Sequence, residues 1–369
     1  MTTRTILRTL VLLGLVATLV GAGVTPGVAA GANADQAGAT QPDTCDFPIE
    51  STDATGTAVT VENEPETVVT LGPSAAQTMW EIGAREKVIG VSQYAKYLEG
   101  AESRTNVSGA ARSYVDVETV VALEPDLVLA PNIIPDETVA KLRSTGLTVY
   151  KFERATSLHA VVEKTRLIGR LTGACAGADE RATEMNRTIA AVRDAVANAD
   201  RPRVLYMMGG GYTAGEGTFI DAIIEAAGGT NVAAEAGIEG YGTISAEVVA
   251  KRDPAWIVVS SGAPTVPQGE AFEESTAYRE GNVFVVDANY INQPAPRTVR
   301  VVERMAATFH PDRYAGAPPY EMAQLTTATP ATTTSTGTST PTTTTTTPGM
   351  GIPVVVLAVA LVGFALGRD

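Results

Sequence analysis

The fold is decided by residues 203–241, which read RVLYMMGGGYTAGEGTFIDAIIEAAGGTNVAAEAGIEGY. The apolar run 204–208 is rich in strand-forming residues, and the glycine-rich loop 209–217 follows it. Thr218 predicts the start of a helix, because threonine caps helix N-termini well. Glycines let a ligand approach the backbone closely, and Tyr212 adds a flat aromatic ring to the same loop. This stretch therefore predicts a strand, a ligand-facing loop and a helix, in that order.

The same succession occurs earlier in the chain. The strand 68–71 with Gly72-Pro73 corresponds to the strand 204–208 with Gly209-Gly210. Further on, each copy has a capping residue, a glutamate two residues later and a proline seven residues after that: Asp116, Glu118 and Pro125, then Ser245, Glu247 and Pro254. Each proline precedes an apolar strand. This ordered correspondence favours a duplicated α/β lobe over chance, and strands that alternate with helices predict parallel sheets.

The remaining segments complete two lobes. We expect a hairpin turn at 53–57, a helix capped by Ser74, a helix at 136–144, a strand at 147–150, a helical segment at 157–198 broken near 173–177, a loop at 287–296 and a closing helix at 298–309. The predicted fold class is α/β, with two parallel-sheet lobes joined by a single long helix. Such a fold places a ligand cleft between the lobes, at the C-terminal ends of the strands.

Both ends of the chain predict an extracytoplasmic protein. Residues 1–30 have the basic start, the apolar region and the small-residue cleavage site of a signal peptide. The residues near the other end are almost all Thr, Ser and Pro, which suits an O-glycosylated stalk. The predicted boundaries are a signal peptide at 1–30, a leader at 31–56, an N-terminal lobe at 57–176, a bridging helix at 177–200, a C-terminal lobe at 201–316, a Thr-rich stalk at 317–347 and a sorting or anchor tail at 348–369.

The chain is acidic, with 41 Asp and Glu against 27 Lys and Arg and a net charge of −14. Acid-rich surfaces keep a protein hydrated in concentrated salt and argue against a nucleic-acid partner. Together with the tail, this composition favours a haloarchaeal protein over an ordinary acidic exoprotein. Sequons at 106–108 and 186–188 are compatible with N-glycosylation. Cys45 and Cys175 are the two cysteines of the chain, so an oxidising compartment predicts a disulfide between them.

The sequence lacks the motifs that common classes of enzyme require. The segment 209–214 fits a dinucleotide fingerprint on paper, but its helix starts late and no ribose-binding acid is in place. Glu216 stands in the region where a phosphate-binding loop needs lysine, and no nucleophile elbow is present. The chain has two distant histidines, His159 and His310, for which we expect structural roles. The sequence therefore predicts no catalysis, no cofactor and no dedicated metal site.

Loop aromatics and amides indicate ligand binding instead. Tyr94, Tyr212 and Tyr241 each follow a predicted strand or lie in a glycine-bearing loop, where they suit stacking and hydrogen bonding to a large flat ligand. The other candidate ligand residues are Thr213, Asn289 and Gln293.

The segments VVTLGPS (68–74), VIGV (88–91), LEPDL (123–127) and GGTNV (228–232) carry a resemblance to a known family. Over residues 57–309 the chain resembles the extracytoplasmic substrate-binding proteins of cobalamin and iron–siderophore ABC importers. The resemblance implies two α/β lobes bridged by one helix, which bend modestly on binding. It also implies a corrinoid or ferric-chelate ligand, a dimeric permease with its ATPase as partner, and a monomeric binding protein.

The resemblance also implies roles for individual residues. Tyr94 matches a ligand-contacting tyrosine of the cobalamin binders, whereas Tyr212 and Tyr241 stand where those proteins have phenylalanine and tryptophan. Asn289 and Gln293 stand in place of Asp and Arg. Two further contacting tryptophans are replaced here by Arg112 and Pro131. Glu118 and Glu247 match the two glutamates that dock onto arginines of the permease.

The C-terminal tail resembles the archaeal surface-sorting tail, in which a Thr-rich stalk precedes Pro-Gly-Phe, an apolar stretch and a basic end. Met350 stands where that family has phenylalanine. The resemblance implies cleavage and attachment to lipid, and a weak membrane anchor is the other interpretation of the tail. Two alternatives to transport remain at this level: a surface-anchored scaffold or adhesion protein, and a degraded oxidoreductase.

Overall fold

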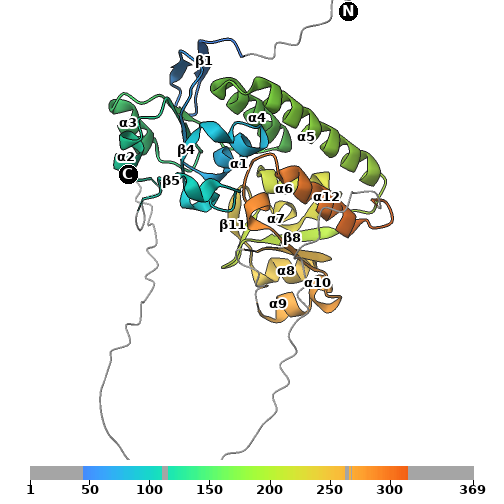
Figure 1. The fold of residues 1–369 in the computed structure, drawn as a ribbon. Helices are drawn as coiled ribbons and strands as arrows, with labels where there is room; N and C mark the ends of the chain where they lie inside the picture. The colour runs from blue at the N-terminus through green and yellow to red at the C-terminus, as the bar shows by residue number, and fades with distance from the viewer. Residues whose placement is uncertain (1–44, 110–114, 262–265, 267, 315–369) are drawn as a thin grey trace, which may run out of the picture. The chain divides into compact units, whose positions relative to one another are not determined.

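The computed structural model describes residues 45–109, 115–261, 266 and 268–314, which form two α/β units (Figure 1). Unit 1 contains the described residues of 45–199, 217–228 and 288–314, and unit 2 contains those of 200–216 and 229–287. The predicted signal peptide, stalk and tail lie outside the described residues, as do most of the predicted leader and Arg112. Within the described part of the chain, no helix combines the length and the apolar character needed to cross a membrane.

Unit 1 is built on a parallel sheet with the strand order β5-β4-β3-β6-β7. The strands are β3 (Val68–Thr70), β4 (Val88–Val91), β5 (Thr105–Asn106), β6 (Leu127–Ala130) and β7 (Val149–Lys151). The central strands β3 and β6 are buried along their whole length, as expected for a sheet covered on both faces. Helices α1 (Pro73–Glu81) and α4 (Leu158–Thr172) cover one face, and α2 (Val117–Ala122) and α3 (Asp136–Ser144) cover the other.

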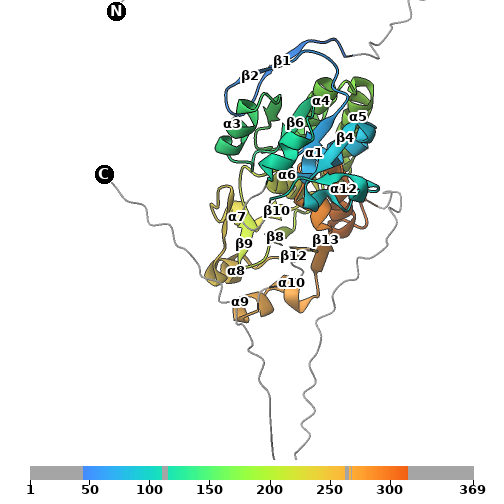
Figure 2. The same cartoon turned by 60° about the vertical axis from the view of Figure 1, so that its left-hand side comes forward.

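An N-terminal hairpin belongs to the same unit (Figure 2). Its strands are β1 (Ile49–Thr52) and β2 (Ala58–Val61), which pair antiparallel on either side of the predicted turn. Asp53 fixes this turn, since its carboxylate accepts the Thr55 N–H at 2.8 Å and a guanidinium N–H of Arg143 at 2.5 Å. Burial alone would raise the pKa of Asp53, but these hydrogen bonds hold it below its ordinary value. Residues 45–56 are thus part of the folded unit rather than of a separate leader.

The long predicted helix also belongs to unit 1. Helix α5 (Cys175–Val196) runs along α4, and Figure 1 shows the two side by side. Two later segments of the chain return to pack against it: α6 (Phe219–Ala226) and α12 (Thr298–Phe309). The break that the sequence predicts near 173–177 occurs at Gly173, which ends α4 with a φ of 75°. The predicted disulfide between Cys45 and Cys175 is confirmed, with Cα atoms 5.8 Å apart.

Unit 2 has a smaller parallel sheet with the order β10-β8-β12-β13. Its strands are β8 (Arg203–Met207), β10 (Thr230–Asn231), β12 (Trp256–Ser260) and β13 (Val283–Val286). A separate antiparallel pair consists of β9 (Tyr212–Ala214) and β11 (Tyr241–Thr243). The helices are α7 (Val232–Glu235), α8 (Ala246–Arg252), α9 (Glu270–Glu273) and α10 (Thr276–Arg279). Val249 of α8 and Phe272 of α9 pack on the sheet residues Leu205 and Ile257 to form the core.

The backbone supports the predicted duplication. Among the described residues, two that are not glycine have a positive φ: Glu124 at 46° and Asp253 at 43°. Each directly precedes the proline of its copy, Pro125 or Pro254. Proline disfavours the right-handed helical region for the residue before it, so the chain ends the helix in a left-handed conformation. The two lobes therefore share a residue with a strained left-handed backbone as well as a sequence pattern.

Some sequence expectations are wrong in detail. Helix α1 begins at Pro73 with Gly72 as its N-cap, so Ser74 is a buried helical residue and not the cap. Proline suits the first helical position because its φ is already helical and it has no N–H to satisfy. The expected loop 287–296 contains the short helix α11 (Ala288–Ile291). The sequence also did not predict β9, β11 or the 3-10 helices η1 (Arg85–Lys87), η2 (Gln93–Ala95) and η3 (Ala101–Ser103).

Candidate functional site

Strand order locates the functional edge of each sheet. In open parallel sheets, ligands bind outside the carboxyl ends of the strands, where neighbouring connections leave in opposite directions. In unit 1 this point lies between β3 and β6, because β4 continues the sheet on one side of β3 and β6 on the other. Gly72 after β3 approaches Pro131 after β6 so closely that an added Cβ would lie 2.6 Å from the proline ring. In unit 2 the corresponding point lies beside β8.

The carboxyl edge of unit 1 presents two exposed apolar side chains. Tyr94 lies in η2, directly after β4, and is 62% exposed. Ile133 follows β6 and is 56% exposed, so it joins Tyr94 as a candidate ligand contact. Ile133 could not be predicted from the sequence, because nothing local distinguishes an exposed isoleucine after a strand from the buried Ile134 beside it.

The edge of unit 2 presents two tyrosines on paired strands. Tyr212 of β9 is 53% exposed and Tyr241 of β11 is 41% exposed. Thr243 pairs with Tyr212, and Tyr241 pairs with Ala214, so the two tyrosines lie diagonally on the same face of the pair. This diagonal spacing is within reach of aromatic side chains.

Thr213 has a different role. It is fully buried between the two tyrosine-bearing positions, and its hydroxyl donates a 2.6 Å hydrogen bond to the main-chain oxygen of Tyr206. Successive residues of a strand point to opposite faces, so Thr213 is directed inward where Tyr212 is directed outward. The structure therefore gives Thr213 a packing role that fixes the β8–β9 connection. This role replaces the ligand contact expected for Thr213 from the sequence.

The two amide residues lie in the last part of unit 1. Asn289 is in α11 and Gln293 follows that helix, and both are partly buried. Their main-chain oxygens are used internally, since the Asn289 oxygen accepts from Gln77 at 3.0 Å and the Gln293 oxygen accepts from the Thr298 hydroxyl at 2.8 Å. Unit 1 thus carries Tyr94, Asn289 and Gln293, and unit 2 carries Tyr212 and Tyr241.

The two candidate docking acids occupy equivalent positions. Glu118 lies in the first turn of α2 and Glu247 in the first turn of α8, and both are exposed. Each follows a capping residue, because Asp116 accepts the Thr119 N–H at 3.1 Å and Ser245 accepts the Val248 N–H at 3.3 Å. The helix dipole favours an acid at this position in both helices.

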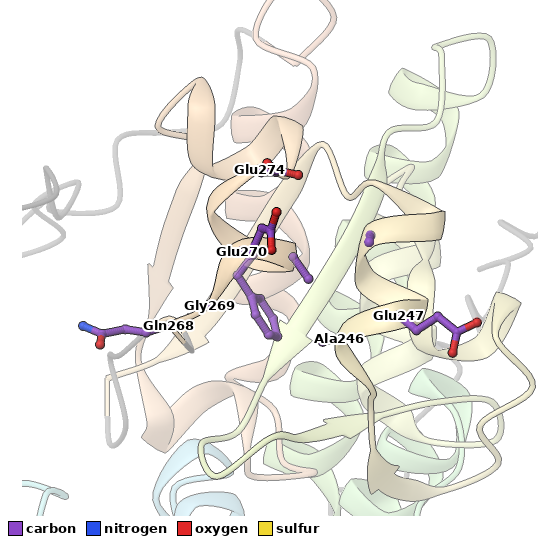
Figure 3. Close-up of a pocket in the computed structure, with 9 residues that line it drawn as sticks. Ala246, Glu247, Gln268, Gly269, Glu270 and Glu274 are labelled. Carbon is purple, nitrogen blue, oxygen red and sulfur yellow. The ribbon is translucent and has the colours of Figure 1, made fainter.

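A pocket of about 370 Å³ lies between α8 and α9 in unit 2 (Figure 3). Phe272 and alanines of both helices form its apolar part, and Glu270 and Glu274 lie beside it. Glu247 is at its margin, with a side chain that extends away from α9 in Figure 3. None of the candidate ligand residues lines this pocket, which is therefore separate from the candidate ligand site.

Histidine, cysteine, aspartate and glutamate are the side chains that most often bind metal ions in proteins. Within the described residues, no group of three or more His, Cys, Asp or Glu side chains converges on one point. His310 is buried, with its ring Nε2 3.2 Å from the main-chain oxygen of Gly228, which is the structural role expected for it. His159 lies on the exposed face of α4.

Two parallel-sheet units with aromatic residues at their carboxyl edges define an α/β ligand-binding protein. The family described as periplasmic binding protein matches residues 68–290. A cobalamin-binding protein of Halobacterium salinarum is 49% identical over 306 residues, which is 79% of this chain and 83% of that relative. The vitamin B12-binding protein of Vibrio cholerae is 25% identical over 247 residues, or 65% and 87% of the two chains.

Solved structures agree with this relationship. The periplasmic heme-binding protein RhuT from Roseiflexus sp. RS-1, in its apo form, matches with a TM-score of 0.60 and 27% identity, covering 67% of this chain and 98% of the other. The chain therefore belongs to the periplasmic binding protein family.

Proposed function

We propose that this protein is the extracytoplasmic substrate-binding protein of an ABC importer, which captures cobalamin, or a ferric siderophore or haem-like chelate, and delivers it to a membrane permease. Membership of the family supports the transport role, and the relative at 49% identity is a cobalamin-binding protein. One observation carries the ligand class: the exposed large apolar residues of the described chain are Tyr94, Ile133, Tyr212 and Tyr241. All four lie at the carboxyl edges of the two sheets.

The chemistry of these side chains suits a large flat ligand. An aromatic ring gains both from burying its apolar surface and from offset stacking on a conjugated macrocycle. The tyrosine hydroxyls add hydrogen bonds to amide or carboxylate groups at the ligand's periphery. Asn289 and Gln293 supply neutral amides, which match the side-chain amides of a corrinoid.

The permease is the second partner in this proposal. Glu118 and Glu247 carry one negative charge on each unit at equivalent positions of the repeat, which suits a partner built from two equivalent subunits. Each glutamate would pair with an arginine of the permease. The signal peptide at 1–30 would direct export of a monomeric binding protein, and the stalk at 317–347 and the tail at 348–369 would hold it at the outer face of the membrane.

Ligand binding is tested by titrating the purified chain with cyanocobalamin, haem and a ferric hydroxamate siderophore. The absorption spectrum and the native mass are recorded for each mixture. We expect saturable binding of one of these molecules at a ratio of one per chain. If none of the three shifts the spectrum or the mass, the proposed ligand class is wrong.

Docking is tested with the double variant Glu118→Ala with Glu247→Ala. Uptake of labelled cobalamin should be lost in cells that depend on this chain, while the affinity for cobalamin in solution stays unchanged. The charge-matched control is Glu137→Ala with Glu239→Ala, because these acids are also exposed, one in each unit. Loss of affinity in the first variant, or equal loss of uptake in the control, would rule out a docking role.

A further inference from the structure

Gln77 is a buried amide in the middle of α1. It is 0% exposed, so its polar atoms must find partners inside the protein. The side-chain nitrogen donates to the Tyr97 hydroxyl at 2.7 Å and to the main-chain oxygen of Asn289 at 3.0 Å. The side-chain oxygen accepts the main-chain N–H of Arg297 at 3.0 Å. One side chain thereby joins three segments: α1, the segment that contains Tyr97 and the segment 289–297.

Two of these segments carry the candidate ligand contacts of unit 1. Tyr97 lies three residues after Tyr94, in the connection that follows β4. Asn289 is itself a candidate contact, and Gln293 lies between it and Arg297. The hydrogen bonds of Gln77 therefore link both ligand-facing segments of unit 1 to the same point of α1.

Neighbouring residues of α1 strengthen the same links. The Trp80 indole donates to the main-chain oxygen of Glu99 at 2.8 Å, which holds the segment after Tyr97. One helical turn beyond Gln77, the Glu81 carboxylate accepts from Arg297 at 2.8 Å. Glu81 fixes the end of the second segment through a side chain, whereas Gln77 reaches the backbone of Asn289 and Arg297 directly.

We propose that Gln77 is a positioning residue for ligand binding, which holds Tyr94 and the 289–293 segment in one fixed arrangement before the ligand arrives. Pre-organisation raises affinity because segments that are already ordered lose less conformational freedom on binding. This inference rests on the proposed function for its effect on affinity. The linkage itself does not, because it is a property of the ligand-free protein.

The first test is Gln77→Met, which keeps the side-chain length and removes all three hydrogen bonds. In the ligand-free protein, we expect faster hydrogen–deuterium exchange of the amides in 93–97 and 288–297, with little change in unit 2. Affinity for cyanocobalamin should fall about tenfold, which corresponds to a loss of about 1.4 kcal/mol of binding free energy.

Thr78→Val is the matched control. Thr78 is also fully buried in α1, and its hydroxyl donates to the main-chain oxygen of Ser74 at 2.9 Å, within the same helix. The substitution removes a buried hydrogen bond and changes the side chain very little. It should lower stability without altering either affinity or the exchange of the two segments.

The second test uses Gln77→Glu and a pH profile. An ionised carboxylate still accepts from the Arg297 N–H, but it has no proton to donate to the Asn289 oxygen, and it bonds the Tyr97 hydroxyl only if that hydroxyl turns to donate. Burial and the facing carbonyl raise the pKa of the introduced carboxyl, and its protonated form regains a donor. Relative to wild type, this variant should bind cyanocobalamin weakly at pH 8 and recover affinity at pH 5.5.

The outcomes distinguish failure of the proposed function from failure of the positioning role of Gln77. If wild type binds none of the three probes while exchange in 288–297 responds to Gln77→Met, the proposed function fails and the linkage stands. If exchange and affinity are the same in Gln77→Met as in wild type, the inference is overturned. It is also overturned if Thr78→Val weakens binding equally, or if Gln77→Glu shows no recovery at low pH.

Discussion

The guanidinium of Arg297 lies 2.8 Å from the carboxylate of Glu81, although 216 residues separate them in the sequence. The second oxygen of Glu81 is 3.2 Å from Arg181, so this buried carboxylate joins α1, α5 and the start of α12. Burial alone would lower the pKa of Arg297, but the hydrogen bond and charge of Glu81 raise it above its ordinary value. The ion pair therefore holds together three distant parts of unit 1.

Removing this carboxylate should destabilise the protein. Glu81→Gln keeps the shape of the side chain but leaves two partly buried guanidinium groups without their charge partner, at a cost of about 3 kcal/mol. Urea unfolding followed by circular dichroism measures the loss. Glu163→Gln is the control, because Glu163 pairs with Arg166 at 2.6 Å but is largely exposed, and it should change stability by less than about 1 kcal/mol. Equal losses in the two variants would contradict the buried role.

Lys164 is expected to make the stability of the protein depend on pH. The Lys164 amine lies 3.5 Å from the Ser74 hydroxyl and 5.9 Å from the ring centroid of Phe152, and burial lowers its pKa to about 7. The unfolded chain keeps this proton up to the ordinary pKa of 10.5, whereas the folded chain releases it near 7. Because the unfolded state binds more protons across this window, stability should rise from pH 7 to about pH 10.

Lys164→Met should remove that dependence. At pH 7 it should stabilise the protein by about 1–3 kcal/mol, since an amine no longer has to be buried. Differential scanning calorimetry at pH 7, 8.5 and 10 measures both effects. Lys141→Met, on the exposed face of α3, should leave the pH dependence of wild type intact. A wild-type Tm that falls over this range in step with the variant's would contradict the prediction.

The disulfide should contribute strongly to stability. Cys45 and Cys175 close a loop with a sequence separation of 130 residues. In the chain-entropy model, a loop of this length restricts the unfolded state by about 5 kcal/mol at 25 °C. The double variant Cys45→Ala with Cys175→Ala should therefore unfold at a lower urea concentration than wild type. Adding a reductant should lower the midpoint of wild type and leave that of the variant unchanged, and a shift in both would point to another cause.

The stacking ring and the hydroxyl of each exposed tyrosine can be tested separately. Tyr212→Ala and Tyr241→Ala each remove a stacking ring and should weaken cyanocobalamin binding about tenfold or more. Phenylalanine at the same positions keeps the ring and isolates the contribution of the hydroxyl. Because these side chains are exposed, the melting temperature should stay within a degree or two of wild type. Tyr278→Ala, in α10 of unit 2, should not affect binding, and isothermal titration calorimetry provides the comparison.

Local signals in the sequence predicted much of the fold. Thr218, Asp116 and Ser245 were expected to cap helices, and each side chain accepts the hydrogen bond of a cap. The helix at 136–144 and the closing helix at 298–309 have the predicted bounds. These features depend on residues a few positions apart, so they can be read without knowledge of the fold. Ser74 failed as a cap because proline at the first helical position was the stronger signal.

Long-range packing set the features that could not be predicted. The sequence predicts a bridging helix at 177–200, but not that its apolar residues Met185 and Ile189 are buried within unit 1, where α5 packs against α4 and α12. At the candidate site, the loop tyrosines could be selected because each follows a strand. Ile133 and Gln77 could not, since one became notable by its exposure and the other by partners more than 200 residues away.

The order of segments in unit 1 affects how the chain folds as it emerges. Unit 2 is inserted within unit 1 in the sequence, and its sheet residues, from Arg203 to Val286, are all available before α12 has been made. Helices α5 and α6 are therefore synthesised before α12, the last described helix, which packs against both of them, while unit 2 already has its complete set of strands. A chain that stops before Thr298 would thus contain every strand of unit 2 but would leave the surface of unit 1 that α12 buries exposed to solvent.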